Sequence, residues 1–317
     1  MPHNPWQQRK IVIVGAGSVG ATFAFALAQT GDFEEIVIVD SNQALSEGQV
    51  LDLAQGFCFM PTTKMRAGGI EDYADADVIV ITAGSKQRPD ESRLNLLKRN
   101  QKIMCSIADD IKSQDPKGVI LVVSNPVDIL TKVVLERTGL PANRVFGSGT
   151  VLDSARLRYY LADRMKVDIH NVHAYVLGEH GDSEFTAWSI ASIGCIDIDQ
   201  YSLTEPLTQA EKASITENVQ RSAYKIIEAK GSTYFAIGMA LVKIVSAIIK
   251  DKKSLLTVSR LITGQHGIDD VCISLPCIVS KDGAQLMPNI HLSTEEQQQL
   301  VESANILKEQ YATLQVE

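Results

Sequence analysis

Short runs of valine and isoleucine recur through the first half of the chain, at residues 11–14, 36–39, 78–82 and 119–123. Apolar runs of this length, with little polar alternation, are typical of parallel strands that are buried on both faces. The segments between them are long enough to hold helices, and one helix is expected to begin near Val19 and end at Gly31. The pattern therefore predicts right-handed βαβ units and an α/β fold.

The pattern changes at the glycine-rich segment 147–150. Beyond it we expect a helix at 153–165, a strand at 172–177, several short strands between 255 and 280, and a last helix at 294–311. Ser293 is a suitable N-cap for that last helix. No flexible linker separates the halves, so we predict two lobes of one unit, at residues 1–147 and 148–317.

Composition narrows the class of protein. The 317 residues carry 30 basic and 38 acidic side chains, and the resulting net charge of −8 argues against general nucleic-acid binding. The five cysteines are scattered without a C-x₂-C spacing, which favours packing roles in a reducing compartment over zinc or disulfide sites. No metal-ligand spacing such as H-E-x-x-H is present among the histidines.

Targeting signals are also missing from the sequence. The N-terminal segment MPHNPWQQRK has no apolar core of the signal-peptide type. The most apolar late stretch, residues 236–249, is interrupted by Lys243 and is too short to span a bilayer. We therefore expect a cytoplasmic protein without a membrane partner, in which 236–249 forms a half-buried helix.

The most specific segment joins the first two predicted strands. Gly15, Gly17 and Gly20 form a G-x-G-x-x-G pattern between a strand and a helix, and Asp40 ends the next strand 20 residues later. The glycines permit a tight turn, close approach of a pyrophosphate and close helix packing, while the carboxylate binds ribose hydroxyls and repels a 2′-phosphate. This predicts a Rossmann-type dinucleotide-binding lobe that prefers NAD, although a glycine turn in another βα unit remains the alternative.

Further cofactor contacts are expected where other elements meet that turn. Val19 opens the first helix, and Thr82, Ala83 and Gly84 end the third strand. Asn125 follows the fourth strand, and ligands of such sheets lie at the carboxyl ends of the strands. A turn-forming Asn-Pro pair without a ligand is the alternative reading for Asn125.

Candidate acid–base residues lie in the second half. Of six histidines, His180 stands out because it lies on a glycine-flanked turn, LGEHGD, after a predicted strand. Asp153 and Arg156 are three residues apart on a predicted helix and so share a face. With Arg93 in a polar loop, these residues form the set that hydride transfer to a 2-oxo acid requires: a proton donor, a carboxylate that orients it, and cations for the substrate.

At this point the chain resembles the lactate/malate dehydrogenase family, and within it the L-lactate branch. The resemblance rests on seven motifs in order along nearly the whole chain: GAGSVG, EGQVLDL, AGSKQRPDESRLNLLKRN, VSNPVDI, SGTVLDSARLR, GEHGD and KGSTYFAIG. It implies a Rossmann-type parallel-sheet lobe followed by a mixed α+β catalytic lobe, with part of 233–252 packed back on the first lobe. The implied reaction is reversible, NADH-dependent reduction of pyruvate to L-lactate.

The resemblance also assigns roles. It implies that His180 is the acid–base residue, that Asp153 orients it, and that Arg156 clamps the substrate carboxylate. Arg93 would polarise the substrate carbonyl. Asn125 would lie near that carbonyl, in a cis peptide bond to proline as in relatives. Thr233 would line the substrate side chain, and Ile237 would pack against the nicotinamide.

The resemblance implies that residue 87 contacts the group beyond C2 of the substrate and so determines which substrate is preferred. Malate enzymes of the family place an arginine there, which pairs with a second carboxylate, whereas lactate enzymes place a glutamine. Counting back six from Arg93 puts Gln87 at this position. A buried, unpaired carboxylate costs several kcal/mol, so Gln87 favours pyruvate. Arg88 keeps malate dehydrogenase as the runner-up, since a shift of one residue would make Arg88 the reader.

An effector site is the remaining implication. Arg158 and His173 match the residues that bind fructose 1,6-bisphosphate across a subunit interface in allosteric bacterial relatives, which implies a homotetramer. A pair of unrelated polar residues is the alternative. A branched 2-hydroxy-acid dehydrogenase and a non-catalytic NAD-binding protein are the other competing functions, and the presence of His180, Asp153 and Arg93 argues against the second.

Overall fold

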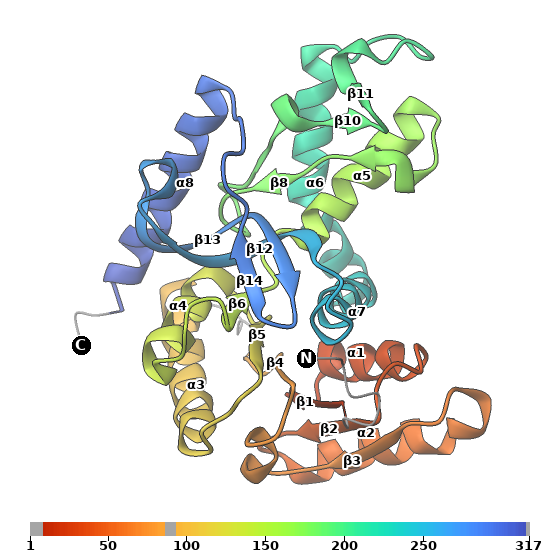
Figure 1. The fold of residues 1–317 in the computed structure, drawn as a ribbon, viewed down its shortest axis with the longest axis vertical. Coiled ribbons are helices and arrows are strands. Elements are labelled where there is room, and N and C mark those ends of the chain that lie inside the picture. The colour runs from red at the N-terminus through yellow and green to blue at the C-terminus, as the bar shows by residue number, and fades with distance from the viewer. Residues whose placement is uncertain (1–8, 86–92, 315–317) are drawn as a thin grey trace.

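The computed structural model describes residues 9–85 and 93–314, and of Arg93 only its place at the start of helix α3. Its centre is a sheet of nine strands in the order β14-β13-β12-β6-β5-β4-β1-β2-β3. The six strands from β3 to β6 are parallel, and their order, 3-2-1-4-5-6, is the Rossmann order. The predicted α/β, Rossmann-type class is therefore confirmed (Figure 1).

The strands of the large sheet come from both halves of the chain. They are β1 (Lys10–Val14), β2 (Glu35–Val39), β3 (Lys64–Ala67), β4 (Val78–Ile81), β5 (Val119–Val122), β6 (Val145–Gly147), β12 (Ser254–Thr263), β13 (Asp269–Ser280) and β14 (Gly283–Leu286). The helices are α1 (Ser18–Ala28), α2 (Gln43–Gln55), α3 (Arg93–Ser113), α4 (Val127–Thr138), α5 (Val151–Met165), α6 (Gln209–Lys230), α7 (Phe235–Ile249) and α8 (Thr294–Ala312).

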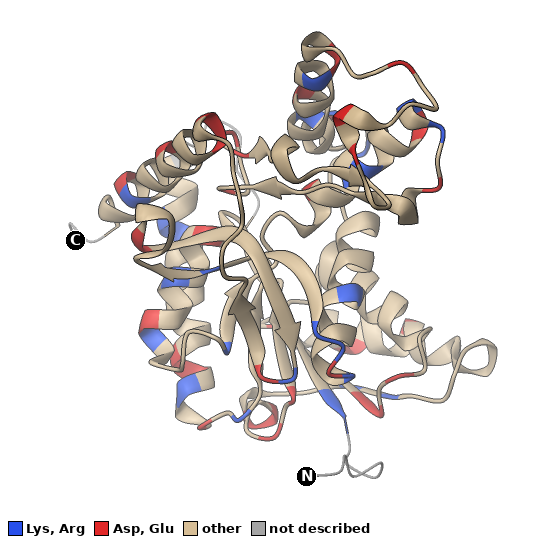
Figure 2. Cartoon of the chain, turned by 45° about the horizontal axis from the view of Figure 1, so that its top comes forward, with Lys and Arg blue, Asp and Glu red and all other residues tan. Residues whose placement is uncertain are grey.

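The apolar runs form strands because both faces of the sheet are covered. Along β1, Ile11 and Ile13 pack toward α1 and α7, whereas Val12 and Val14 pack toward α3 and α4. None of these four side chains is more than 4% exposed. In Figure 2 the central strands are almost free of charge, and acidic and basic residues lie on the surrounding helices and loops. The carboxyl ends of β1, β4 and β5 are thereby held rigidly at one edge.

Two strand predictions in the second half were wrong. Residues 255–280 form two long antiparallel strands rather than several short ones, and Pro276 lies within β13 opposite Thr257 of β12. Pairing on both sides of β13 outweighs its local strand breakers. Residues 172–177 form two separate strands, β7 (Val172–His173) and β8 (Val176–Leu177), which pair with β10 (Ser192–Ile193) and β9 (Phe185–Thr186).

Helix α7 belongs to the second half but packs on the first. Its residues Leu241 and Val245 share a core with Phe23 and Leu27 of α1. A Cβ at Gly238 would lie 3.0 Å from Thr22, so the two helices approach closely. In the described part of the chain no helix is both long and apolar enough to cross a membrane.

A buried ion network ties β1 to the segment before β4. Lys10, whose side chain is 7% exposed, donates to Asp72 at 2.8 Å and to Asp75 at 2.6 Å. Burial alone would raise the pKa of Asp72, but Arg66 and Lys10 hold that pKa below its usual range. The network anchors the amino-terminal edge of the sheet, opposite the edge that ends at the glycine turn.

We expect Asp72→Ala to lower the free energy of unfolding by about 3 kcal/mol, because it removes the buried partner of a buried ammonium. Asp75→Ala is the matched control, since Asp75 is 74% exposed and binds the same Lys10. Its loss should be under about 1 kcal/mol. Urea denaturation at a fixed protein concentration measures both, and equal losses would contradict this account of the network.

Candidate active site

The glycine turn after β1 is built for a close ligand. Gly15 has φ +112°, and a Cβ there would lie 2.6 Å from the backbone nitrogen of Ala83. A Cβ at Gly20 would lie 1.9 Å from the carbonyl oxygen of Gly15, whereas one at Gly17 would meet no described atom within 4 Å. Helix α1 begins at Ser18 with no side-chain cap on its first turn. Its N–H groups and positive dipole end therefore suit a pyrophosphate.

Asp40 lies at the same turn. Its Oδ2 accepts a hydrogen bond from the Ala16 N–H at 2.7 Å, and its Oδ1 accepts one from the Asn42 N–H at 2.8 Å. The carboxylate thus fixes the glycine turn from the end of β2, beside the space where the ribose of a dinucleotide would lie. This arrangement fits the dinucleotide predicted from the spacing of Gly15, Gly17, Gly20 and Asp40.

The carboxyl ends of β4 and β5 complete this edge. The Thr82 hydroxyl donates to the Gly15 carbonyl at 3.0 Å, and the Ser124 hydroxyl donates to the Ala83 carbonyl at 2.5 Å. Gly84 is exposed next to Ser124. The Asn125–Pro126 peptide bond is cis, as the resemblance implied.

Val19 and Ile237 lie on either side of the α1–α7 contact. Both are half-buried and pack against the same core cluster. Thr233 lies two residues before α7 and is half-buried. The structure therefore places Val19 and Ile237 in the core that α1 and α7 share.

His180 and Asp153 form the centre of the second-half site. Asp153 lies in the first turn of α5, 2% exposed, and its Oδ2 is 2.6 Å from His180 Nδ1. Its Oδ1 accepts a hydrogen bond from Arg156 Nη1 at 2.8 Å. The His180 side chain keeps 25% of its surface exposed. With Nδ1 on the carboxylate, the other ring nitrogen, Nε2, is the atom left to exchange a proton with a ligand.

The charges of this group determine its protonation. Burial alone would lower the pKa of His180, but the Asp153 carboxylate, by its charge and its hydrogen bond, raises that pKa to about 9. Burial likewise opposes ionisation of Asp153, and His180 and Arg156 together hold its pKa below the usual range. At neutral pH the pair is therefore an imidazolium bound to a carboxylate, which can donate a proton and later recover it.

Two buried carboxyls near His180 were missed by the sequence reasoning. Glu184, four residues after His180, is 5% exposed, and burial followed by the charge of Asp153 raises its pKa. Asp128, 2% exposed at the start of α4, accepts the His180 backbone N–H at 2.8 Å. The sequence signal for Asp128 was its position in VSNPVDI, six residues after the end of β5 and in the first turn of the next helix.

By distance alone, the residues around His180 could bind a metal ion. Asp153, His180 and Glu184 each offer one ligand atom, and these atoms lie within 4.8 Å of one another. However, the His180–Asp153 hydrogen bond uses one pair of those atoms and the Arg156 cation already neutralises Asp153. The arrangement therefore favours a proton over a divalent cation between these groups.

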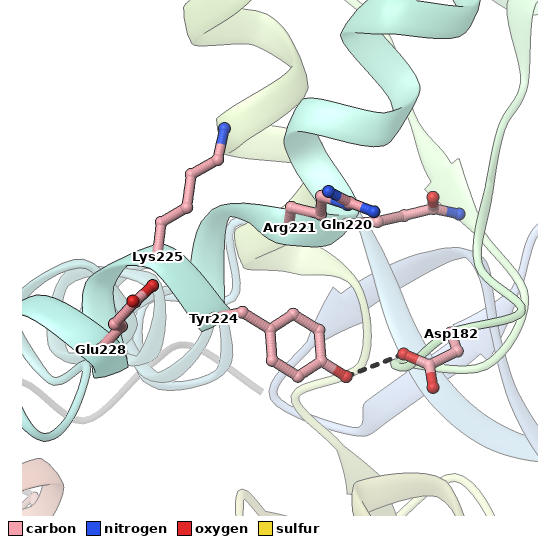
Figure 3. A pocket seen from close by; sticks show the side chains of 6 residues that line it. All are labelled: Asp182, Gln220, Arg221, Tyr224, Lys225 and Glu228. Carbon is pink, nitrogen blue, oxygen red and sulfur yellow. Dashed lines mark hydrogen bonds between the residues drawn. The ribbon is translucent and has the colours of Figure 1, made fainter.

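The turn that carries His180 is also tied to helix α6. Tyr224 of α6 donates to Asp182 Oδ1 at 2.8 Å (Figure 3). The pocket around this bond has a volume of about 550 Å³ and is lined by Asp182, Gln220, Arg221, Tyr224, Lys225 and Glu228. Gln220 adds a second tie, because its amide donates to the Glu184 carbonyl at 2.9 Å. These contacts fix the position of the turn from the solvent side.

Other predicted residues lie elsewhere or outside the described chain. Gln87 and Arg88 lie outside the described residues, as does the side chain of Arg93. Arg158 contacts neither Asp153 nor His180. Its Nε donates to the Ala174 carbonyl at 3.1 Å, next to the exposed His173 on β7. Arg158 therefore lies against the segment that carries His173, and it is five residues further along α5 than Asp153.

Comparison with known families decides the relationship. Residues 9–147 match the model of the lactate/malate dehydrogenase NAD-binding domain, and residues 150–316 match the lactate/malate dehydrogenase alpha/beta C-terminal domain. The chain belongs to the lactate/malate dehydrogenase family. As a member of this family it is an NAD-dependent oxidoreductase, and the cofactor for which the glycine turn is built is NAD.

Individual relatives agree with this assignment. L-lactate dehydrogenase of Treponema denticola is 49% identical over 311 residues, covering 97% of this chain and 99% of the relative. Among solved structures, a lactate dehydrogenase from a deep-sea metagenome of the Medee basin has a TM-score of 0.94 at 41% identity, covering 97% of this chain and 99% of its own. The minor L-lactate dehydrogenase of Enterococcus mundtii has a TM-score of 0.94 at 36% identity, covering 98% and 100%.

In this dehydrogenase we expect Asp153→Asn to lower the pKa of His180 from about 9 to or below its ordinary value near 6.5, because burial then acts without the opposing charge. NMR titration of ¹⁵N-histidine-labelled protein measures this pKa. Asp168→Asn is the matched control, since Asp168 and His170 form the same pair at 2.7 Å on the surface. A His180 pKa that is unchanged in Asp153→Asn contradicts the assigned coupling.

Proposed function

We propose that this chain is an L-lactate dehydrogenase, which reduces pyruvate to L-lactate with NADH and catalyses the reverse reaction. The observation that carries the proposal is the 2.6 Å contact between His180 Nδ1 and Asp153, with Arg156 on the other carboxylate oxygen. All three relatives named above are lactate dehydrogenases. This supports pyruvate rather than oxaloacetate as the substrate. A cytoplasmic location belongs to the same proposal.

When bound, NADH supplies the hydride for C2 of the substrate. His180 then delivers its proton from Nε2 to the carbonyl oxygen, and in the reverse direction it takes the hydroxyl proton back. Asp153 keeps the imidazole in the required tautomer and stabilises its charged form. Arg156 is placed three residues along the same helix, where its guanidinium can bind the substrate carboxylate with two parallel hydrogen bonds.

Substrate choice is assigned to the loop before α3 on sequence grounds. Gln87 would face the pyruvate methyl group, and Arg93 would polarise the carbonyl. A second carboxylate opposite Gln87 would be buried without a cation, at a cost of several kcal/mol. A cost of about 3–4 kcal/mol corresponds to roughly 10²–10³-fold discrimination.

We therefore expect kcat/KM for pyruvate to exceed that for oxaloacetate by about 10²–10³-fold. Gln87→Arg should shift the preference toward oxaloacetate, because it supplies the missing cation. Steady-state NADH oxidation with both substrates measures this. Arg88→Gln is the neighbouring control and should leave the pyruvate preference intact. An oxaloacetate preference that Arg88→Gln removes would identify Arg88 as the reader and the enzyme as a malate dehydrogenase.

We also propose a homotetramer whose activity responds to fructose 1,6-bisphosphate. Support for assembly comes from α2, which buries only Ser46 within the chain and exposes Leu45 and Leu51. Val50 and Leu53 pack partly against the core, so the exposed leucines are the apolar surface of α2 that a partner would cover. Support for the effector comes from Arg158 and His173, since paired Arg/His sets across a two-fold axis suit a ligand with two phosphates.

Adding the bisphosphate should lower the KM for pyruvate or shift the sedimentation profile toward the tetramer. The double variant Arg158→Gln/His173→Ala should lose this response and keep kcat at saturating pyruvate. Analytical ultracentrifugation and initial rates, each with and without effector, test both parts. A titration that changes neither oligomer size nor pyruvate affinity rejects the effector site but leaves the lactate dehydrogenase assignment standing.

A further inference from the structure

Asp128 is a second carboxylate that contacts His180, in addition to Asp153. It lies in the first turn of α4, three residues after Asn125, and therefore belongs to the cofactor side of the molecule. Its Oδ2 accepts the backbone N–H of His180 at 2.8 Å. Asp153, from α5, holds the ring of the same histidine at 2.6 Å. His180 is thus held at its backbone from one half of the chain and at its ring from the other.

Asp128 is too deeply buried for this contact to be incidental. It is 2% exposed, and within the described residues its Oδ1 accepts no well-aligned hydrogen bond. Burying a carboxylate costs free energy unless its charge is paired or hydrogen-bonded. The first turn of a helix lowers that cost, since the dipole favours a negative group there.

The neighbours of Asp128 have opposing effects on its pKa, which lies just below neutral pH. Burial raises the pKa of Asp128 to about 6, and the Ser259 hydroxyl and the His180 N–H offset part of that effect. The charged His180 ring lowers this pKa further, whereas Glu179 on the same turn raises it. Of the other titratable groups near it, Cys272 of β13 stays a neutral thiol because burial raises its pKa, and Lys132 of α4 is paired with Asp270. Asp128 is therefore ionised at pH 7–9, where His180 carries its proton.

We propose that Asp128 is a positioning residue for proton transfer: its charge adds to that of Asp153 in stabilising the His180 imidazolium, and its hydrogen bond fixes the His180 turn against the cofactor-side helix α4. The inference rests on the proposed role of His180 as proton donor. Asp128 does not touch the substrate. It acts by setting the position and the pKa of the residue that does.

The first test replaces the charge and keeps the shape. In Asp128→Asn the His180 pKa, read by ¹⁵N-histidine NMR, should fall on the order of one pH unit, because a buried negative charge near the ring is lost. The alkaline limb of kcat/KM for pyruvate reduction should move by the same amount. An unchanged His180 pKa, or a lower melting temperature alone, overturns the proposal.

Ser259→Ala is the matched structural control. It removes the buried hydroxyl beside Asp128 and keeps the carboxylate, so the His180 pKa should stay at its wild-type value.

The wild-type chain supplies a test that needs no substitution of Asp128. The His180 backbone amide resonance should titrate with a midpoint near pH 6, and the midpoint should rise in Ser259→Ala. A midpoint above pH 7.5 would mean that Asp128 is neutral where His180 carries its proton, and it would also overturn the proposal.

One further variant separates this inference from the proposed function. His180→Asn should abolish pyruvate reduction if His180 is the proton donor. Full activity of His180→Asn would reject the proposed function itself. A dead His180→Asn with a wild-type Asp128→Asn would reject only the role of Asp128.

Discussion

The contact between His180 and Asp153 is the interaction on which the rest of the site depends. A buried imidazole alone would be neutral at pH 7, and a buried aspartate alone would be protonated or destabilising. Placed 2.6 Å apart, each holds the other in its charged form. The fold supplies the required precision, because α5 carries Asp153 in its first turn and the β8–β9 turn carries His180. In the proposed mechanism, the proton needed for reduction is therefore held beside Arg156, which would bind the anionic substrate.

The large sheet explains how this pair meets the cofactor. Strand β12, from the second half, pairs with β6 through Ser259 and Gly147, so the two halves share one sheet. Helix α7 returns to pack on α1, and Asp128 reaches from α4 to the His180 turn. Each connection crosses between the halves. Together they fix the glycine turn and the acid–base pair in one rigid frame, which hydride and proton transfer to the same carbonyl group require.

Local patterns in the sequence predicted the parallel sheet, the glycine turn and the last helix well. Buried parallel strands leave continuous apolar runs, and Gly15 and Gly20 are required by contacts that no side chain would permit. The sequence failed where distant pairing decides the structure. Pro276 and the Asp269-Asp270 pair suggested interruptions, yet β12 and β14 hold β13 as one strand. Asp128 and Glu184 were missed because only the fold brings them to His180.

The resemblance to the family added roles that residue types alone could not give, such as the different faces assigned to Arg156 and Arg158. The most direct test of the account is the pH dependence of kcat/KM for pyruvate reduction by the unmodified chain, which reports the ionisation of the free enzyme. The pairing of His180 with Asp153 predicts a plateau through neutral pH and a tenfold fall per pH unit above about 9, as His180 loses its proton. A fall with a midpoint at or below the ordinary histidine value near 6.5 would contradict it, because Asp153 would then not be holding the imidazolium.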